Sequence, residues 1–268
     1  MSGLLPPVLL VGCGRMGGAM LGAWLERGLS PSALVDPAPR LPAGSEAMTV
    51  VGEAAGLPEG FAPAAIVLAI KPQQAASVLP QFARFAGSAV FLSIMAGRTI
   101  GGMRAALGPE AAVVRAMPNT PAAIRAGTSV ACAGPGVNAE GRALCEALLA
   151  AVGTVAWVEE EGLLDAVTAL SGSGPAYVFL LAELLERAGV EQGLPADLAR
   201  LLARRTVSGA GALLAATSED AAALRAAVTS PGGTTEQALA VLMEKDAWPA
   251  AVSRALAAAT ARSRALAG

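Results

Sequence analysis

The sequence predicts an α/β fold, with a doubly wound parallel sheet in its first part and an all-helical domain after it. Short apolar segments alternate with helical segments as far as residue 159, and a glycine-rich turn follows the first of them. From residue 160 onward the strand-like segments stop, and helices punctuated by Gly, Pro and Ser follow. Since strands separated by helices form parallel sheets, we expect domains at residues 1–159 and 160–268.

The predicted strands are short apolar runs, which suit a sheet that helices cover on both faces. They lie at residues 8–11, 33–35, 66–70, 89–93, 111–116, 129–132 and 154–158. Helices are expected between them, at 16–26 and from about residue 73. Each connection between parallel strands is then expected to be a right-handed crossover.

The second half of the chain carries signals for helix starts. Pro175 and Pro195 suit the first turns of helices at 176–188 and 196–207, because a first turn needs no amide hydrogen there. The other predicted starts are Ser218 as an N-cap, Thr234 with Gln237 at capping-box spacing, and a helix after Pro249. Alanine dominates these helices and bulky residues are few, so we expect this domain to complete its core against a second copy of the chain.

Composition excludes several classes of function. The 268 residues contain no histidine, which removes His-based triads, His general bases and most zinc sites. A net charge of -2 and an aromatic content of 3% provide neither a basic stripe nor stacking platforms for nucleic acid. The three cysteines form no CxxC pair, so we expect a reduced, cytoplasmic protein without a disulfide or a metal. No apolar run reaches the roughly 18 residues of a membrane span, and no basic leader is visible.

The turn after the first predicted strand favours a dinucleotide site. Gly12 permits a tight turn, Gly14 lets a pyrophosphate approach the backbone, and Gly17 lets the helix pack on the strand. A tight turn without a ligand is the plainer interpretation, but the position between a strand and a helix favours cofactor binding. The residues expected at the cofactor here are Gly12, Cys13, Gly14, Arg15, Met16 and Gly17.

Asp36 ends the second predicted strand, about 20 residues beyond the glycines, where a carboxylate accepts hydrogen bonds from the adenosine ribose. A carboxylate there repels a 2′-phosphate and favours NAD. Arg40 is a nearby cation that is able to hold the phosphate of NADP, so both cofactors stay open.

Three further turns follow strands at the same edge of the predicted sheet, where open α/β folds bind ligands. They place Lys71, Asn119 and Thr120 among apolar residues, although Lys71 alone is plainer as a solvated lysine. Pro118 and Pro121 stiffen the loop around Asn119, and one of these X-Pro bonds is a candidate cis bond. The residues expected on the nicotinamide side are Ala69, Ile70, Lys71, Pro72, Ala96, Gly97 and Asn119.

The segment 228–239 predicts an anion site. Pro231 and the two glycines after it end any earlier helix and leave backbone amides at the start of a helix at Thr234. Unpaired amides and the helix dipole both favour negative charge, and a hydroxyl from Ser230 or Thr235 stands beside them. A turn with a helix cap is the plainer interpretation. The residues expected to hold a small carboxylate are Ser230, Gly232, Gly233, Thr234 and Thr235.

Four segments, in this order, resemble the pyrroline-5-carboxylate reductase family. They are AIKP at 69–72, RAMPNTP at 115–121, SGSGPAYVF at 171–179 and VTSPGGTT at 228–235. The resemblance implies a Rossmann-type first domain, a helical dimerisation domain, and an intertwined homodimer or an oligomer of such dimers. It also implies an active site that joins the cofactor domain of one subunit to the Ser-Pro-Gly-Gly loop of the other.

The same resemblance implies hydride transfer from NADPH or NADH to the C5=N bond of 1-pyrroline-5-carboxylate, which gives L-proline at the end of proline biosynthesis. The substrate carboxylate is then expected on Ser230, Gly232, Gly233 and Thr234. Thr235 is expected to face the ring nitrogen, and Lys71 is the second catalytic candidate. Because a protonated imine is reactive, positioning is the main task and histidine is not needed.

Other functions remain open at this point. A reductase of another cyclic imine would carry the same motifs. A non-catalytic dinucleotide-binding redox sensor would keep the three glycines and would have no need of the anion site. A β-hydroxyacid dehydrogenase would need a lysine base after the domain junction, and residues 161–188 contain no lysine. A purely structural helical oligomer leaves the first half unexplained.

Overall fold

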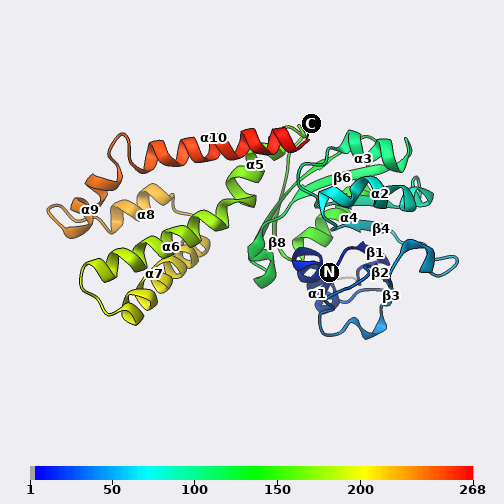
Figure 1. The fold of residues 1–268 in the computed structure, drawn as a ribbon, viewed down its shortest axis with the longest axis horizontal. Helices are drawn as coiled ribbons and strands as arrows, with labels where there is room; N and C mark the ends of the chain where they lie inside the picture. Colours follow the sequence, from blue (N-terminus) through cyan, green and yellow to red (C-terminus); the bar gives the residue numbers. More distant parts are fainter. Residues whose placement is uncertain (1–3, 268) are drawn as a thin grey trace. The chain divides into compact units, whose positions relative to one another are not determined.

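The structure is a computed structural model that describes residues 4–267 (Figure 1). It contains two compact units. The first comprises the chain as far as Gly172 together with the segment from Ala259 onward, and the second is Ser173–Ala258. The predicted domain boundary between residues 159 and 160 stays a prediction.

The first unit is built on a sheet with the strand order β3-β2-β1-β4-β5-β6-β7-β8 in the described residues. The strands are β1 (Val8–Val11), β2 (Ala33–Val35), β3 (Thr49–Val51), β4 (Ala65–Leu68), β5 (Val90–Ser93), β6 (Ala112–Met117), β7 (Gly127–Ala133) and β8 (Gly153–Trp157). The predicted α/β fold is therefore confirmed, including all seven predicted strands. The sequence missed β3, whose first two residues are exposed, so that it lacks the apolar pattern of a buried strand.

One strand pair departs from the predicted parallel sheet. β7 runs antiparallel to β6, and Arg115 pairs with Cys132. Residues 118–126 are all that join these strands, and they hold a single short 3-10 helix, η5 (Thr120–Ile124). A parallel crossover needs about a dozen residues or more, usually with an α-helix, so this connection is too short for one.

Helices cover both faces of the sheet because its side chains alternate between them. Leu10, Val67 and Leu92 belong to the cluster that includes α1 (Arg15–Arg27) and α4 (Ala139–Ala150). The indole N–H of buried Trp24 in α1 also donates to the Leu148 carbonyl of α4, at 2.9 Å.

The other face buries the neighbouring side chains Leu9, Ile66 and Phe91. The elements on this side are α2 (Ala75–Val78), η4 (Leu79–Phe85), α3 (Ile100–Leu107) and α5 (Leu163–Val167). The helix predicted from residue 73 is thus mostly 3-10 turns, beginning with η3 (Pro72–Gln74). The remaining short elements are η1 (Ser45–Ala47), η2 (Ala54–Gly56) and η6, a π-helix (Thr168–Gly172).

The second unit is helical, as predicted. It contains α6 (Gly174–Glu191), α7 (Ala196–Ala216), α8 (Ala221–Ala227), α9 (Thr234–Leu242) and the first part of α10 (Trp248–Ala267). Pro175 lies in the first turn of α6 as expected, and Pro195 is the N-cap of α7. The predicted N-cap at Ser218 is wrong. The Thr217 hydroxyl accepts the Glu219 N–H at 3.1 Å, so a turn comes first and α8 is capped at Asp220.

Helices of the second unit leave large apolar side chains exposed. Within its described residues only Ala199 and Ala203 are fully buried hydrophobics. The exposed apolar side chains on α6 and α7 include Val178, Phe179, Leu180, Leu184, Leu185, Val190, Leu198, Leu201, Leu202, Leu213 and Leu214. Such a face is typical of a protein–protein interface.

One helical stretch among the described residues, Leu163–Glu191, is long and apolar enough to cross a membrane by length and composition. A single stretch of this kind is weak evidence for a membrane span. From the sequence, no apolar run of this length was expected.

Candidate functional site

The glycine turn after β1 has the geometry of a phosphate cradle. Gly12 has a φ of +92°, and a Cβ added to it would lie 2.7 Å from the Ala69 carbonyl oxygen. A Cβ on Gly17 would overlap the Gly12 carbonyl oxygen. Around Gly14, in contrast, a Cβ would meet nothing within 4 Å. The first and third glycines are therefore required by packing, whereas the middle one leaves space for a ligand.

The backbone amides in the first turn of α1 are the ones available to an anion, because the Gly12 and Cys13 amides already donate to Val35 and Asp36. Gly14 is the N-cap of α1, and no side chain caps the helix. The first amides of a helix have no acceptor within the helix, and the helix dipole adds partial positive charge there. This end of α1 thus suits a pyrophosphate, as the sequence predicted.

Asp36 is held rigidly at the end of β2. One carboxylate oxygen accepts the Cys13 N–H at 2.6 Å, and the other accepts the Ala38 N–H at 2.8 Å. The Cys13 thiol donates to the Arg40 carbonyl at 3.3 Å. Burial, and then the negative charge of Asp36, raise the pKa of the Cys13 thiol, although the Arg40 contact lowers it. The thiol therefore stays protonated and serves as a structural donor.

A cavity of about 360 Å³ brings these elements together with the turns after β3 and β4. The predicted site residues that line it are Gly12, Gly14, Asp36, Ala69, Ile70 and Lys71. The other predicted cofactor residues do not line it; they are Cys13, Arg15, Met16, Gly17, Pro72, Ala96, Gly97 and Asn119. Their contacts with a cofactor stay predictions.

Sequence reasoning missed Glu53, Gln74 and Gln81, which line the same cavity. Glu53 follows β3, the strand that the sequence did not reveal. Parallel strands end at one edge of a sheet, so recognition of β3 would have placed the turn containing Glu53 beside Asp36.

Lys71 is exposed, and its backbone N–H donates to the Gln74 side-chain oxygen at 3.3 Å.

The side-chain amide of Asn119 is fixed through both its oxygen and its nitrogen. Its amide oxygen accepts the Thr128 N–H at 2.8 Å, and its amide nitrogen donates to the Ser171 hydroxyl at 3.2 Å. The amide is thus fixed by partners on β7 and η6, whereas stiffening of the loop by its prolines stays a prediction. The candidate cis X-Pro bond beside it is wrong, because the described residues contain no cis peptide bond.

The predicted anion site, in the second unit, lies at the start of α9. Gly233 is the N-cap, with no side-chain cap, so the predicted capping box of Thr234 and Gln237 does not form. Thr234 is already the first helical residue, and its side chain therefore lies past the cap position. The first amides of α9, from Thr234 to Glu236, have no acceptor within the helix.

The two glycine amides are not bare, contrary to the sequence expectation. Gly233 donates to the Ser230 carbonyl at 3.0 Å, which closes the turn. Gly232 has a φ of +71° and donates to the Glu236 carboxylate at 2.8 Å. A Cβ on Gly233 would overlap the Ser230 hydroxyl. The structure therefore brings Ser230 and both glycines together, and a carboxylate from the chain itself already binds one of the amides.

Thr235 is half-buried in the first turn of α9, whereas Thr234 beside it is exposed. A hydroxyl, free helix amides and a glycine turn thus lie within one short segment. This set of donors suits a small ligand that carries a carboxylate and a second polar atom.

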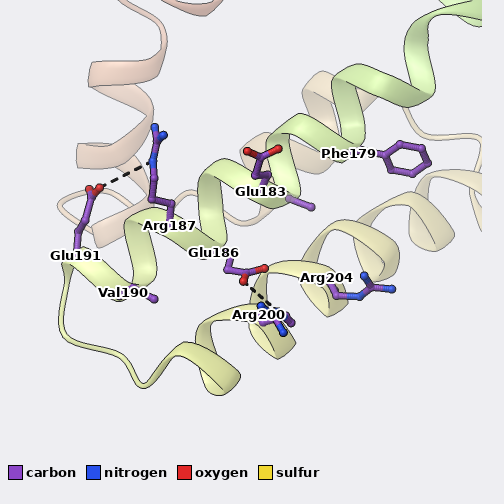
Figure 2. Close-up of a pocket in the computed structure, with 9 residues that line it drawn as sticks. Phe179, Glu183, Glu186, Arg187, Val190, Glu191, Arg200 and Arg204 are labelled. Atoms are coloured by element: carbon purple, nitrogen blue, oxygen red, sulfur yellow. Dashed lines mark hydrogen bonds and ion pairs between the residues drawn. The ribbon is translucent and has the colours of Figure 1, made fainter.

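A different cavity, of about 580 Å³, lies on α6 and α7 (Figure 2). Its lining combines apolar Phe179 and Val190 with charged side chains. Glu186 points toward Arg200, with an ion pair of 3.0 Å, and Arg187 pairs with Glu191 at 3.9 Å (Figure 2). It has neither a glycine turn nor a hydroxyl among its lining residues, so it does not resemble the two candidate sites above. No group of three His, Cys, Asp or Glu residues in the described part of the chain is suited to a metal ion.

Comparison with known proteins agrees with this arrangement. Residues 161–266 match the family model for pyrroline-5-carboxylate reductase dimerisation. The chain is 37% identical to the pyrroline-5-carboxylate reductase of Pseudomonas aeruginosa, over 98% of this chain and 97% of that one.

Two solved structures are similar over nearly the whole chain. The pyrroline-5-carboxylate reductase of Coxiella burnetii superposes with a TM-score of 0.89 at 31% identity, covering 98% of this chain and 99% of that one. The Plasmodium falciparum enzyme, solved with NADP bound, has a TM-score of 0.84 at 28% identity and covers 99% and 100%.

Proposed function

The chain belongs to the pyrroline-5-carboxylate reductase family, and we propose that it transfers a hydride from a nicotinamide cofactor to the C5=N bond of 1-pyrroline-5-carboxylate, giving L-proline. The observation that carries this proposal is the hydrogen bonding at the start of α9. The Gly232 N–H there already donates to a carboxylate, that of Glu236, and Thr235 lies next to Glu236 in the first turn of the helix. The open glycine turn at Gly14 supports cofactor binding in the first unit. This reaction is the last step of proline biosynthesis.

Each polar group then has a defined task. The amides at Gly232 and in the first turn of α9, with the Ser230 hydroxyl, hold the substrate carboxylate. Thr235 hydrogen-bonds the ring nitrogen and stabilises its proton. The reduced nicotinamide supplies the hydride when it is bound. Lys71 lies in the cofactor cavity and is the second residue that we assign to the reacting end.

The direct test is oxidation of NADH and of NADPH by purified protein after 1-pyrroline-5-carboxylate is added, with proline identified as the product. We expect rapid oxidation that depends on the substrate. Tight cofactor binding without turnover would favour the redox sensor, and turnover of a different cyclic imine alone would favour that alternative substrate.

Cofactor preference is expected to favour NAD. Asp36 and Glu53 line one cavity, so a 2′-phosphate entering it would meet two carboxylates. Like charges about 4 Å apart repel by up to about 4 kcal/mol near a protein surface. Arg40, exposed beyond Asp36, is the nearby cation able to reduce that repulsion.

Replacing Asp36 with Ser should therefore raise the ratio of kcat/KM for NADPH to that for NADH by about 10- to 100-fold, equivalent to about 1.4–2.7 kcal/mol. Steady-state kinetics with both cofactors measure this ratio. Glu53→Gln should change it in the same direction, and the exposed Glu59→Gln is the matched control. An unchanged ratio in Asp36→Ser would remove Asp36 from cofactor selection.

Glu236 is expected to compete with the substrate, because its carboxylate occupies the Gly232 amide that the substrate carboxylate needs. Replacing Glu236 with Gln removes the charge but keeps the size of the side chain. We expect KM for 1-pyrroline-5-carboxylate to fall about two- to tenfold, because a hydrogen bond to a charged group is worth about 1.5–3 kcal/mol and a neutral one less. A raised KM would instead make Glu236 a supporting residue of the site.

We further propose that two chains associate through the exposed apolar faces of α6 and α7, which the partner subunit would cover. Light scattering over a range of concentrations should give at least the mass of a dimer. A monomer mass at every concentration would contradict this, and a mass larger than that of a dimer would indicate an oligomer of dimers.

We place the enzyme in the cytoplasm, in keeping with the free thiols of Cys13, Cys132 and Cys145.

We also propose that the active site is shared between the two subunits of the dimer. An inactive Gly14→Val chain mixed with an inactive Thr235→Val chain would then regain part of the activity in mixed dimers. Independent sites within each chain would give no recovery.

A further inference from the structure

The end of α10 returns to the unit that contains the sheet. Residues from Ala259 onward belong to this unit, and Figure 1 shows the red end of α10 beside α5. Ser263, only 5% exposed, donates its hydroxyl to the Asp165 carboxylate of α5 at 2.7 Å. Asp165 is 9% exposed. A carboxylate this deeply buried needs a hydrogen-bond partner, so the pair ties the helix end firmly to α5.

One turn further along, α10 touches the turn after β5. Gly97 in that turn has a φ of +69°, and an added Cβ would lie 3.0 Å from the Leu266 Cβ and 3.1 Å from the Leu266 carbonyl oxygen. The backbone of the turn is thus packed directly against the helix end. Gly97 is one of the residues predicted on the nicotinamide side.

From this turn the contacts continue to the residues beside the cofactor cavity. The Arg98 guanidinium donates to the Pro72 carbonyl at 2.9 Å, and Pro72 follows Lys71. A series of contacts thus leads from Leu266 to the turn that contains Lys71, through Gly97, Arg98 and Pro72.

A second set of contacts leads from the residues just before α5. Glu161 accepts the Ile100 N–H and a hydrogen bond from the Arg115 guanidinium, both at 2.8 Å. Arg115 is 5% exposed and lies on β6, which leads to the Asn119 loop. The segment that anchors Ser263 therefore also anchors the start of α3 and the end of β6.

We propose that the last turns of α10 position the nicotinamide-side turns for hydride transfer, with Ser263 and Asp165 as positioning residues that act through Leu266 and Gly97. This inference rests on the proposed function. Neither residue contacts the cofactor cavity, so loss of their bond should move the turns rather than remove a cofactor contact. Reaction rates are sensitive to such movement, since a misplacement of 1 Å costs about 100-fold.

The test compares Ser263→Ala with Ser263→Thr, which keeps a hydroxyl, and with Ser253→Ala, an exposed serine on the same helix. We expect kcat of Ser263→Ala to fall about tenfold while KM for the cofactor changes less than about twofold. The kinetic isotope effect with cofactor deuterated at nicotinamide C4 should rise, because hydride transfer becomes more rate-limiting. Ser263→Thr should recover most of kcat. The inference would be overturned if the isotope effect stayed unchanged and kcat fell only because a smaller fraction of the protein molecules was active.

Hydrogen exchange provides a readout that does not depend on activity. In Ser263→Ala the backbone amides of 94–98 should exchange about tenfold faster than in the wild type, and Ser253→Ala should show no change. Equal exchange in all three proteins would overturn the inference. If Ser263→Ala does not fold, Asp165→Asn, which keeps an acceptor but loses the charge, takes its place with the same expected direction. A wild type that fails to reduce the imine would count against the proposed function alone, because the exchange data still test the packing of α10.

Discussion

Replacing Thr235 with Val is expected to lower kcat by about 100-fold or more while the protein still folds. The substitution keeps the shape of the side chain and removes the hydroxyl that we assign to the ring nitrogen. A positioned group that stabilises charge or a proton in the transition state contributes about 10²–10⁴-fold. Thr235 lies half-buried in the first turn of α9, where a β-branched residue is already accommodated.

The matched control is Thr235→Ser, which keeps the hydroxyl and should retain most of kcat. Thermal unfolding and the oligomeric mass should stay close to those of the wild type in both variants. An unaltered kcat in Thr235→Val would remove Thr235 from the chemistry and leave Lys71 as the candidate proton donor.

Two glycine substitutions in the cofactor turn are expected to have opposite signatures. Gly12→Ala should destabilise the protein by about 2–5 kcal/mol, because an L-residue in the left-handed region costs about 1–2 kcal/mol and overpacking about 1–3 kcal/mol more. The added Cβ would lie 2.7 Å from the Ala69 carbonyl oxygen. Gly14→Ala should leave stability nearly unchanged, since nothing lies within 4 Å. Its methyl group would instead block the approach of a pyrophosphate, and we expect about a 100-fold weaker cofactor Kd.

Thermal unfolding and cofactor titration of both variants separate these effects. Gly18→Ala, whose Cβ would meet the Arg40 carbonyl oxygen at an ordinary 3.6 Å, is the control within the same helix. A Gly14→Ala protein with normal cofactor affinity would show that the pyrophosphate does not approach the backbone here. A stable Gly12→Ala protein would show that the turn is able to rearrange.

Local patterns were sufficient to predict most of the fold. The apolar runs that became β1, β4 and β5 are buried on both faces, so their strand character is plain in the sequence alone. β3 could not be predicted in this way, because its first two residues are exposed and only pairing with β2 makes it a strand. The antiparallel pairing of β7 was likewise missed, since strand direction depends on what connects two strands and not on their own residues.

The sequence predicted which turns lie around the cavity, but it did not predict the hydrogen-bond partners of the backbone amides. The positions of Gly12, Asp36 and Lys71 around one cavity follow from the rule that ligands bind where parallel strands end. The partners of the Gly232 and Gly233 amides did not follow, because Glu236 reaches back by one helical turn only once α9 has formed.

The sequence by itself determined the α/β class, the family and the position of the two glycine-containing turns, because glycines, prolines and apolar periodicity act over a few residues of the chain. Only the tertiary structure decided which distant groups meet. Examples are Glu53 in the cavity of Asp36, the ion pair of Glu161 with Arg115, and the hydrogen bond of Ser263 to Asp165, which 98 residues of chain separate. Contacts of this kind arise from packing of whole elements against one another, and no local pattern encodes them.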